Sequence, residues 1–333
     1  MRQVSEIKQI HTKFSGIRKQ FAALRLYFVW GALVILGILF LKAPAVAAMG
    51  VSEGLSLCVS SVIPALFPFM VIAGVASASG LCRSAGKITA APLARLLGFS
   101  PPTSAAFLVG LISGFPVGAV SVISLYQSRQ IEKNEAEFAL GLCNNTGPAF
   151  LCGYLGARLW GDAGLGFLFW AAEALAALAC GMLCKRLWLG KNRFQAVSTS
   201  FCVFRFGEIA RVISGSAQNL LTVCGFVVFF TVLQTTLRTF LGFAAEAVPP
   251  ALRGLFSGFL EVTSGLAASV GDLSLPFLAV SAFLVGWAGL CVHLQVMYFA
   301  AEAGLRMRRY FVQKLLCGLL TALFTVFAVL LFR

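Results

Sequence analysis

SGFPVG at 113–118 and CNNTGP at 143–148 each divide an apolar run of this sequence in two. Glycine allows unusual backbone dihedral angles and proline lacks a backbone donor, so both residues interrupt helices. Lipid offers no hydrogen-bond partners, and broken backbone at membrane depth is tolerated only where protein covers it or where it lines a wet cavity. The two stretches therefore indicate a membrane protein that encloses a solute, as transporters do.

The composition places the chain among membrane proteins. Of its 333 residues, 59% are hydrophobic and 11% are charged. The hydrophobic share is higher and the charged share lower than in soluble globular domains. A membrane-spanning helix takes about 20 apolar residues. We expect an all-α polytopic membrane protein with apolar runs at 26–42, 62–80, 104–126, 138–158, 164–184, 212–236, 252–270, 274–300 and 311–332.

The net charge of +14 does not indicate nucleic-acid binding, because the basic residues stand in short clusters between apolar runs. Cytoplasmic loops of membrane proteins carry this excess of lysine and arginine. We therefore expect a lipid bilayer around the chain, a cytoplasmic N-terminus and no nucleic-acid partner. The clusters are Arg18, Lys19 and Arg25; Arg83, Lys87 and Arg95; Lys185, Arg186, Lys191 and Arg193; and Arg306, Arg308 and Arg309.

The ten cysteines predict neither a disulfide framework nor a structural metal site. Most of them lie within apolar runs, and His11 and His293 are the only histidines. Buried thiols act as small hydrophobic groups. The signatures of metalloproteases and of P-loop enzymes are missing. We expect that the protein is not an enzyme and that it uses no cofactor, with Na⁺ or H⁺ as its coupling ion.

The run at 104–126 decides the topology. If it crosses the membrane, the most basic loop, 185–211, falls outside; if it is a re-entrant hairpin broken at SGFP, that loop stays inside. The run at 252–270 is then a second hairpin that enters from the other side. Within each half, an amphipathic stretch (45–60 and 200–214) precedes a span. The expected organisation is a basic N-terminal segment (1–25), a first transmembrane helix (26–42), repeat unit 1 (45–158, with hairpin 104–126 and broken helix 138–158), a linking helix (164–184), repeat unit 2 (200–302, with hairpin 252–270 and broken helix 274–300) and a C-terminal helix (311–332).

Weak internal similarity supports an inverted repeat. LISGFPVG at 111–118 resembles LFSGFLEV at 255–262, and CNNTGPAFLCGYLGA at 143–157 precedes WAGLCVHLQVMYFAA at 287–301 by the same number of residues. Chance similarity between glycine-rich apolar runs is the alternative. Inverted repeats of this kind place a transporter's binding site at the membrane midplane.

The first candidate site consists of the interruptions in unit 1. The ends of the half-helices carry partial charge that suits an anionic group, and the side chains add neutral donors and acceptors. We predict substrate binding by Ser113, Gly114, Asn144, Asn145 and Thr146. The alternative is a proline–glycine kink whose backbone groups are satisfied by neighbouring helices.

The second candidate site consists of the matching interruptions in unit 2. An ionisable residue at membrane depth is costly and indicates function, so Glu261 is predicted to couple ion or proton movement. Thr263, Ser264, His293 and Gln295 are predicted to bind substrate. His293 has the alternative of a core histidine. Outside these sites, Glu173 is expected to make a buried hydrogen bond or to pair with an arginine, and 128–137 is expected to be a solvated helix face.

At these motifs the chain resembles the sporulation integral membrane protein family YlbJ, within the wider nucleoside-recognition or gate-domain group. The residues that carry the resemblance are IPALFPFMVIAG at 63–74, GLISGFPVGA at 110–119, LCNNTGPAFLCGYLG at 142–156, GFLEVTSGL at 258–266 and GLCVHLQV at 289–296. That group is similar to the concentrative nucleoside transporters, which have two inverted hairpins and two broken helices.

The resemblance implies a transporter that moves dipicolinic acid, a small aromatic dicarboxylate, across the outer forespore membrane during sporulation. Its partners would be this small anionic substrate and the bilayer, and a homo-oligomer is compatible with the sequence. A nucleoside or another small metabolite is the alternative cargo. A non-transporting membrane component of spore assembly is the alternative function.

Overall fold

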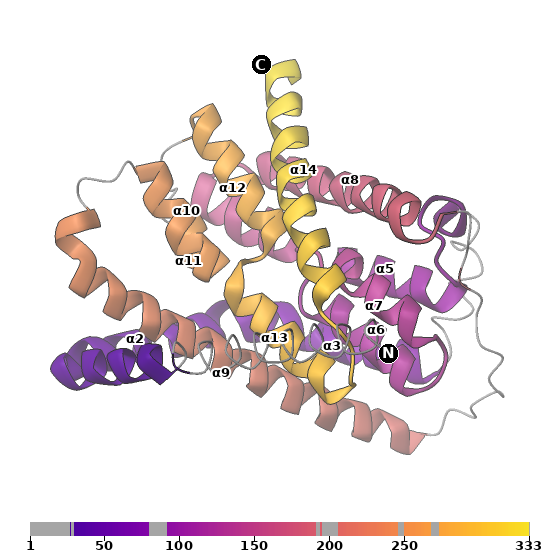
Figure 1. Cartoon of the computed structure of the whole chain (residues 1–333), viewed down its shortest axis with the longest axis horizontal. Helices are drawn as coiled ribbons and strands as arrows, with labels where there is room; N and C mark the ends of the chain where they lie inside the picture. The colour runs from indigo at the N-terminus through magenta and orange to yellow at the C-terminus, as the bar shows by residue number, and fades with distance from the viewer. Residues whose placement is uncertain are drawn as a thin grey trace, which may run out of the picture.

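The computed structural model describes residues 27, 30–79, 92–190, 194, 206–245, 250–267 and 273–332, and within them every regular element is a helix (Figure 1). Five helices are long and apolar enough to cross a bilayer: Pro44–Ala76, Ala163–Trp188, Gly207–Phe240, Leu275–Glu302 and Arg308–Leu331. The chain is thus an all-α polytopic membrane protein, as the sequence predicts. The N-terminal segment 1–25 lies outside the described residues. A shorter apolar helix, Trp30–Lys42, lies within the first predicted transmembrane run, and whether it crosses the membrane stays a prediction.

The helices of the described residues have the following bounds. They are α2 (Pro44–Leu57), η1 (Cys58–Val62), α3 (Ile63–Ala78), α5 (Pro101–Ser113), α6 (Val117–Gln127), α7 (Lys133–Cys143), η2 (Ala149–Trp160), α8 (Ala163–Trp188), α9 (Phe206–Ala245), α10 (Pro250–Leu260), α11 (Val262–Ala267), α12 (Leu275–Trp287), α13 (Gly289–Glu302) and α14 (Arg308–Phe332).

The four predicted interruptions are breaks between pairs of helices. The chain breaks at 114–116 between α5 and α6, at 144–148 between α7 and η2, at Glu261 between α10 and α11, and at Ala288 between α12 and α13. The two halves of each predicted hairpin pack against each other. Entry of the hairpins from opposite sides of the membrane stays a prediction.

Local sequence explains where the first hairpin begins and turns. Pro101 opens α5 at a position where the missing N–H has no helical partner. Gly114 ends α5 with a φ of +84°, a conformation that glycine adopts without the steric cost of a side chain. Pro116 then immediately precedes α6. The sequence SGFP therefore terminates one helix and starts the next within three residues.

The expected division of each unit into an amphipathic stretch and a separate span is wrong. Residues 44–78 form one continuous helical rod, in which the short π-helix η1 joins α2 to α3 and Pro68 lies inside α3 without ending it. Residues 206–245 likewise form the single helix α9. Neighbouring helices can satisfy the backbone groups that a proline leaves in a membrane helix, so proline alone did not mark an end.

The two rods lie side by side and antiparallel (Figure 1). Cβ atoms added to Gly50, Gly54 and Gly74 would meet α9 at Val232, Val228 and Val212 respectively. Small residues permit this close approach of two membrane helices.

The stretch GVSEG at 50–54 has the spacing of a hydrolase nucleophile elbow, but it lies within α2, whereas an elbow is a strand-to-helix turn.

Replacing Gly54 by alanine should weaken the contact between the rods. The added Cβ would lie 2.8 Å from the Cα of Val228, which is backbone and cannot rotate away. We expect a loss of about 1–3 kcal/mol in unfolding free energy, as for other overpacked cores, measured as a lower thermal midpoint of the purified protein in detergent. Gly37→Ala is the control, because a Cβ at Gly37 has no atom within 4 Å. Equal stability of the two variants would contradict the packing.

The expectation of a fully solvated face over 128–137 is also wrong. Glu135 is completely buried, and its Oε1 accepts a hydrogen bond of 2.8 Å from the backbone N–H of Ser100. Ile131 is buried as well. The segment therefore anchors the start of α5 to α7, and only part of its surface faces solvent.

Candidate functional site

The two interruptions of the first half cross each other with their backbones in contact. A Cβ on Gly114 would lie 2.7 Å from the amide nitrogen of Gly147, and a Cβ on Gly147 would lie 3.1 Å from that of Gly114. Real Cβ atoms do not tolerate the shorter of these distances. Glycine at both positions therefore permits the crossing of 114–116 and 144–148.

The two interruptions of the second half also touch. Ala288 and Gly289 have φ angles of +74° and +76°, which end α12 and turn the chain into α13. A Cβ on Gly289 would lie 3.1 Å from the carbonyl oxygen of Gly258 and 3.1 Å from the amide nitrogen of Val262. The break at Ala288 therefore packs directly on the second hairpin, next to its own break at Glu261.

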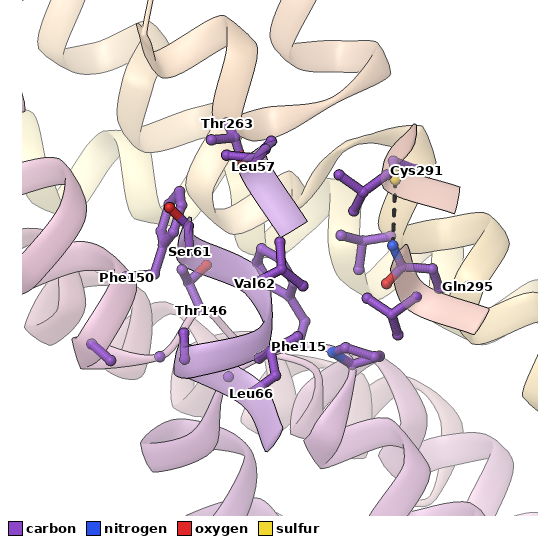
Figure 2. A pocket seen from close by; sticks show the side chains of 18 of the residues that line it. Leu57, Ser61, Val62, Leu66, Phe115, Thr146, Phe150, Thr263, Cys291 and Gln295 are labelled. Atoms are coloured by element: carbon purple, nitrogen blue, oxygen red, sulfur yellow. Dashed lines mark hydrogen bonds between the residues drawn. The ribbon is translucent and has the colours of Figure 1, made fainter. Parts of the chain in front are cut away.

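One cavity of about 90 Å³ lies between the two halves of the chain (Figure 2). One water needs roughly 10–15 Å³ of such space, so several waters or one small solute can occupy it. Three of the four interruptions contribute lining residues, and the fourth, at Ala288, lies just before the lining stretch of α13. The lining residues are Leu57, Ser61, Val62, Ala65, Leu66, Ser113, Gly114, Phe115, Pro116, Thr146, Gly147, Ala149, Phe150, Val223, Val227, Glu261, Thr263, Cys291, Val292 and Gln295.

The cavity is largely apolar and carries a few polar groups. Glu261 is the one carboxylate among its lining residues; its side chain is buried, and its Oε1 accepts a 2.9 Å hydrogen bond from the backbone N–H of Thr263. Gln295 donates from Nε2 to the sulfur of Cys291 at 3.3 Å (Figure 2). An apolar pocket with a few placed polar groups is the usual form of a small-molecule site.

Six of the ten predicted site residues line this cavity: Ser113, Gly114, Thr146, Glu261, Thr263 and Gln295. Asn144, Asn145 and His293 are buried but are not among the lining residues. Ser264 lies in α11, and its side chain lies outside what the structure describes. The structure thus brings together six predicted residues from both halves of the chain. The other three described side chains point away from the cavity.

Those three side chains make structural hydrogen bonds. Tyr310 of α14 receives a 3.0 Å hydrogen bond from Nδ2 of Asn144, and its hydroxyl lies 2.9 Å from Nδ1 of His293. The His293 ring also packs edge-on against Trp287, with ring centroids 4.3 Å apart. Nδ2 of Asn145 donates to the carbonyl oxygen of Leu142 at 2.8 Å and so covers the end of α7. These contacts attach two of the interruptions to α14 and to one another.

Two charged residues next to the 144–148 interruption complete the site. Nζ of Lys314 donates to the carbonyl oxygen of Asn144 at 2.7 Å, and Oε1 of Glu173 accepts from the amide of Thr146 at 2.9 Å. Glu173 thus makes the expected buried hydrogen bond. Sequence reasoning missed Lys314, although a lysine inside the apolar run 311–332 is an intramembrane ionisable residue by the rule that singled out Glu261.

Comparison with known proteins identifies a relative of this chain. The chain is 28% identical over 308 residues to the sporulation integral membrane protein YlbJ of Bacillus subtilis (strain 168), with 82% of this chain and 75% of the relative covered. No family model matches the chain, and no solved structure matches it. The helical fold with several membrane-spanning helices is what an integral membrane protein requires. The chain is therefore similar, over most of its length, to the sporulation integral membrane protein YlbJ.

Proposed function

We propose that the protein is a secondary transporter that moves dipicolinic acid across the outer forespore membrane during sporulation. The observation that carries the proposal is the cavity between the two halves of the chain, which is lined by three of the four helix interruptions and contains a buried carboxylate. Broken backbone at membrane depth is tolerated around such a cavity. The relationship to a sporulation integral membrane protein supports the cellular setting.

The lining suits a flat aromatic solute with polar substituents. Two aromatic rings, of Phe115 and Phe150, line the cavity and offer faces on which a pyridine ring can stack (Figure 2). The starts of α6 and η2 border it at Pro116 and Ala149, and helix starts favour negatively charged groups. The carboxylates of dipicolinate would lie toward these two helix starts.

Glu261 would repel a dianion when it is charged. Its place in this account is therefore coupling: it takes up a proton or a Na⁺ ion together with the solute, so that the charges compensate inside the low-dielectric cavity. Transport would then depend on pH if the coupling ion is H⁺, and on the Na⁺ concentration if the coupling ion is Na⁺.

An inverted repeat completes the proposal. In each half a long helical rod precedes a hairpin and a broken helix, which touch each other at glycine residues. The rods of the two halves are antiparallel. Transporters built in this way expose a central site alternately to the two sides of the membrane. Residue-by-residue solvent accessibility over 104–126 and 252–270 tests the repeat, which requires that the two hairpins open to opposite sides.

Flux in proteoliposomes tests the function. We expect the purified full-length chain to carry labelled dipicolinate across the vesicle membrane, with no competition from nucleosides. Competition by nucleosides would indicate the same fold with a nucleoside cargo. No flux of either solute from correctly inserted protein would favour a non-transporting component of spore assembly.

Filling the cavity should block transport. Ala65 of α3 lines the cavity, and Ala65→Phe would place a ring in a space of about 90 Å³. We expect dipicolinate flux to fall by roughly tenfold or more, because the solute and the ring would compete for the same volume. Ile72→Phe, on the same helix and 64% exposed, is the control and should keep full flux. Unchanged flux in Ala65→Phe would place the pathway elsewhere.

A further inference from the structure

The interruption at 144–148 presents two oppositely polarised backbone ends. The last carbonyl groups of a helix carry partial negative charge, and the first N–H groups of the next helix carry partial positive charge. Here α7 ends with Asn144 as its C-cap, and η2 begins at Ala149. In an apolar surrounding, both ends need partners.

Each end has a buried side chain of the complementary charge. Lys314 places its ammonium 2.7 Å from the carbonyl oxygen of Asn144, at the negative end of α7. Glu173 accepts from the amide of Thr146, on the side that leads to η2, and its Oε1 is also 3.1 Å from the Thr146 hydroxyl. Lys314 is 0% exposed and Glu173 is 1% exposed. The two charges therefore match the polarity of the interrupted helix.

The two residues come from adjacent membrane helices, α8 and α14, which pack against each other. Burial of a single charge is strongly unfavourable, whereas two opposite charges nearby compensate each other. The backbone of 144–146 lies between the carboxylate and the ammonium and is hydrogen-bonded to both. The two side chains therefore hold this stretch of backbone through one hydrogen bond each.

The pair also reaches the cavity through Thr146. This residue lines the cavity, and its hydroxyl lies within hydrogen-bond distance of Glu173 and, at 3.2 Å, of the carbonyl oxygen of Val285 in the second half of the chain. A shift of the Glu173 carboxylate would therefore move a wall of the cavity and its contact with α12.

We propose that Glu173 and Lys314 are positioning residues of the cavity, and that the Lys314 ammonium is a tethered cation which occupies the carbonyl end of the broken helix. A mobile alkali ion could neutralise such a helix end in a transporter. Here a side chain of the protein does so, and the shape of this interruption is independent of Na⁺. The inference deepens the proposed function and rests on it for the role of the cavity, but its test needs no transport.

Hydrogen exchange of the full-length protein in detergent tests the charge pairing. In Lys314→Met the Asn144 carbonyl loses its partner, so the amides of 144–147 should exchange about 10–100-fold faster than in the wild type. Glu173→Gln keeps an acceptor for Thr146 but loses the charge. In the double variant the Asn144 carbonyl still lacks its donor, so exchange should stay faster than in the wild type, but by less than the product of the two single effects, because the two side chains act on the same backbone. Effects of the two single changes that simply add would overturn the pairing.

Thr325→Val is the matched control, because Thr325 is a fully buried polar residue of α14 whose hydroxyl has no hydrogen-bond partner among the described residues, and valine has the same shape. It should leave exchange at 144–148 unchanged. A rate in Lys314→Met equal to that in Thr325→Val would overturn the positioning role.

Chemical rescue tests the tethered cation. Lys314→Ala leaves a space next to the Asn144 carbonyl, and added methylammonium should slow exchange at 144–148 by about fivefold or more through binding there. Tetramethylammonium is too large for that space, and Lys314→Met fills it, so neither combination should respond. Methanol has nearly the size of methylammonium but carries no charge, so it should not slow exchange. Equal slowing by methanol and methylammonium would show a purely packing role of Lys314 and overturn the inference. Absence of dipicolinate flux in the wild type would reject the proposed function and leave this test intact.

Discussion

Replacement of Glu261 by glutamine is expected to abolish coupled transport and to leave the fold intact. Glutamine has the same size and keeps an oxygen that can accept from the amide of Thr263, as Oε1 of Glu261 does at 2.9 Å. It cannot ionise, so it cannot take up a proton or pair with Na⁺. Coupling free energies between two ligands of one protein correspond to roughly 5–150-fold in affinity, and we expect accumulation of dipicolinate in proteoliposomes to fall by a factor in this range.

Glu208→Gln is the control for this experiment. Glu208 forms a surface ion pair with Arg211 at 2.8 Å and is far more exposed than Glu261, so its loss should leave flux unchanged. The pH and Na⁺ dependence of the wild type should disappear in Glu261→Gln. If the variant keeps both the flux and its ion dependence, Glu261 is not the coupling residue.

Replacement of Gly114 by alanine is expected to destabilise the protein more strongly than Gly54→Ala does. Two costs combine at this position. A left-handed φ of +84° costs a residue with a side chain about 1–3 kcal/mol. In addition, the new Cβ would lie 2.7 Å from the amide nitrogen of Gly147, which is backbone. The crossing of the two interruptions would have to open.

Gly161→Ala gives the cost of a positive φ without a clash, at a ψ of +11° in place of the −178° of Gly114. Gly161 also has a left-handed φ, of +70°, but a Cβ there has no atom within 4 Å. We expect Gly161→Ala to show the backbone cost alone, and Gly114→Ala to lower the thermal midpoint by a further 5 °C or so and to eliminate dipicolinate flux. Equal midpoints for the two variants would mean that the interruptions do not touch.

Much of the fold follows from simple physical rules. The length of the apolar runs is sufficient to identify an all-α membrane protein, because a bilayer admits few other structures for such runs. The positions of Gly114, Pro116, Gly147 and Pro148 locate two helix breaks, since these residue types cannot continue a helix without cost. The continuity of the rods 44–78 and 206–245 could not be predicted in the same way, because a proline in a membrane helix does not always end the helix.

The orientation of polar side chains at the interruptions could not be predicted from the sequence. Helical periodicity tells which residues share a face, but irregular backbone has no period from which to infer direction. Thr146 therefore lines the cavity, whereas Asn144 beside it contacts Tyr310. The partners of the interruption, Glu173 and Lys314, lie on helices far away in sequence, and only tertiary packing brings them to it.

A structure of the full-length protein with dipicolinate bound tests the central claim most directly. The claim is that the interrupted helices enclose a solute site. We predict that the pyridine ring lies between Phe115 and Phe150, with its carboxylates toward the starts of α6 and η2 and with Glu261 within reach of a bound ion or proton. Dipicolinate bound at another place, with this cavity closed by side chains in a protein that transports it, would contradict the account.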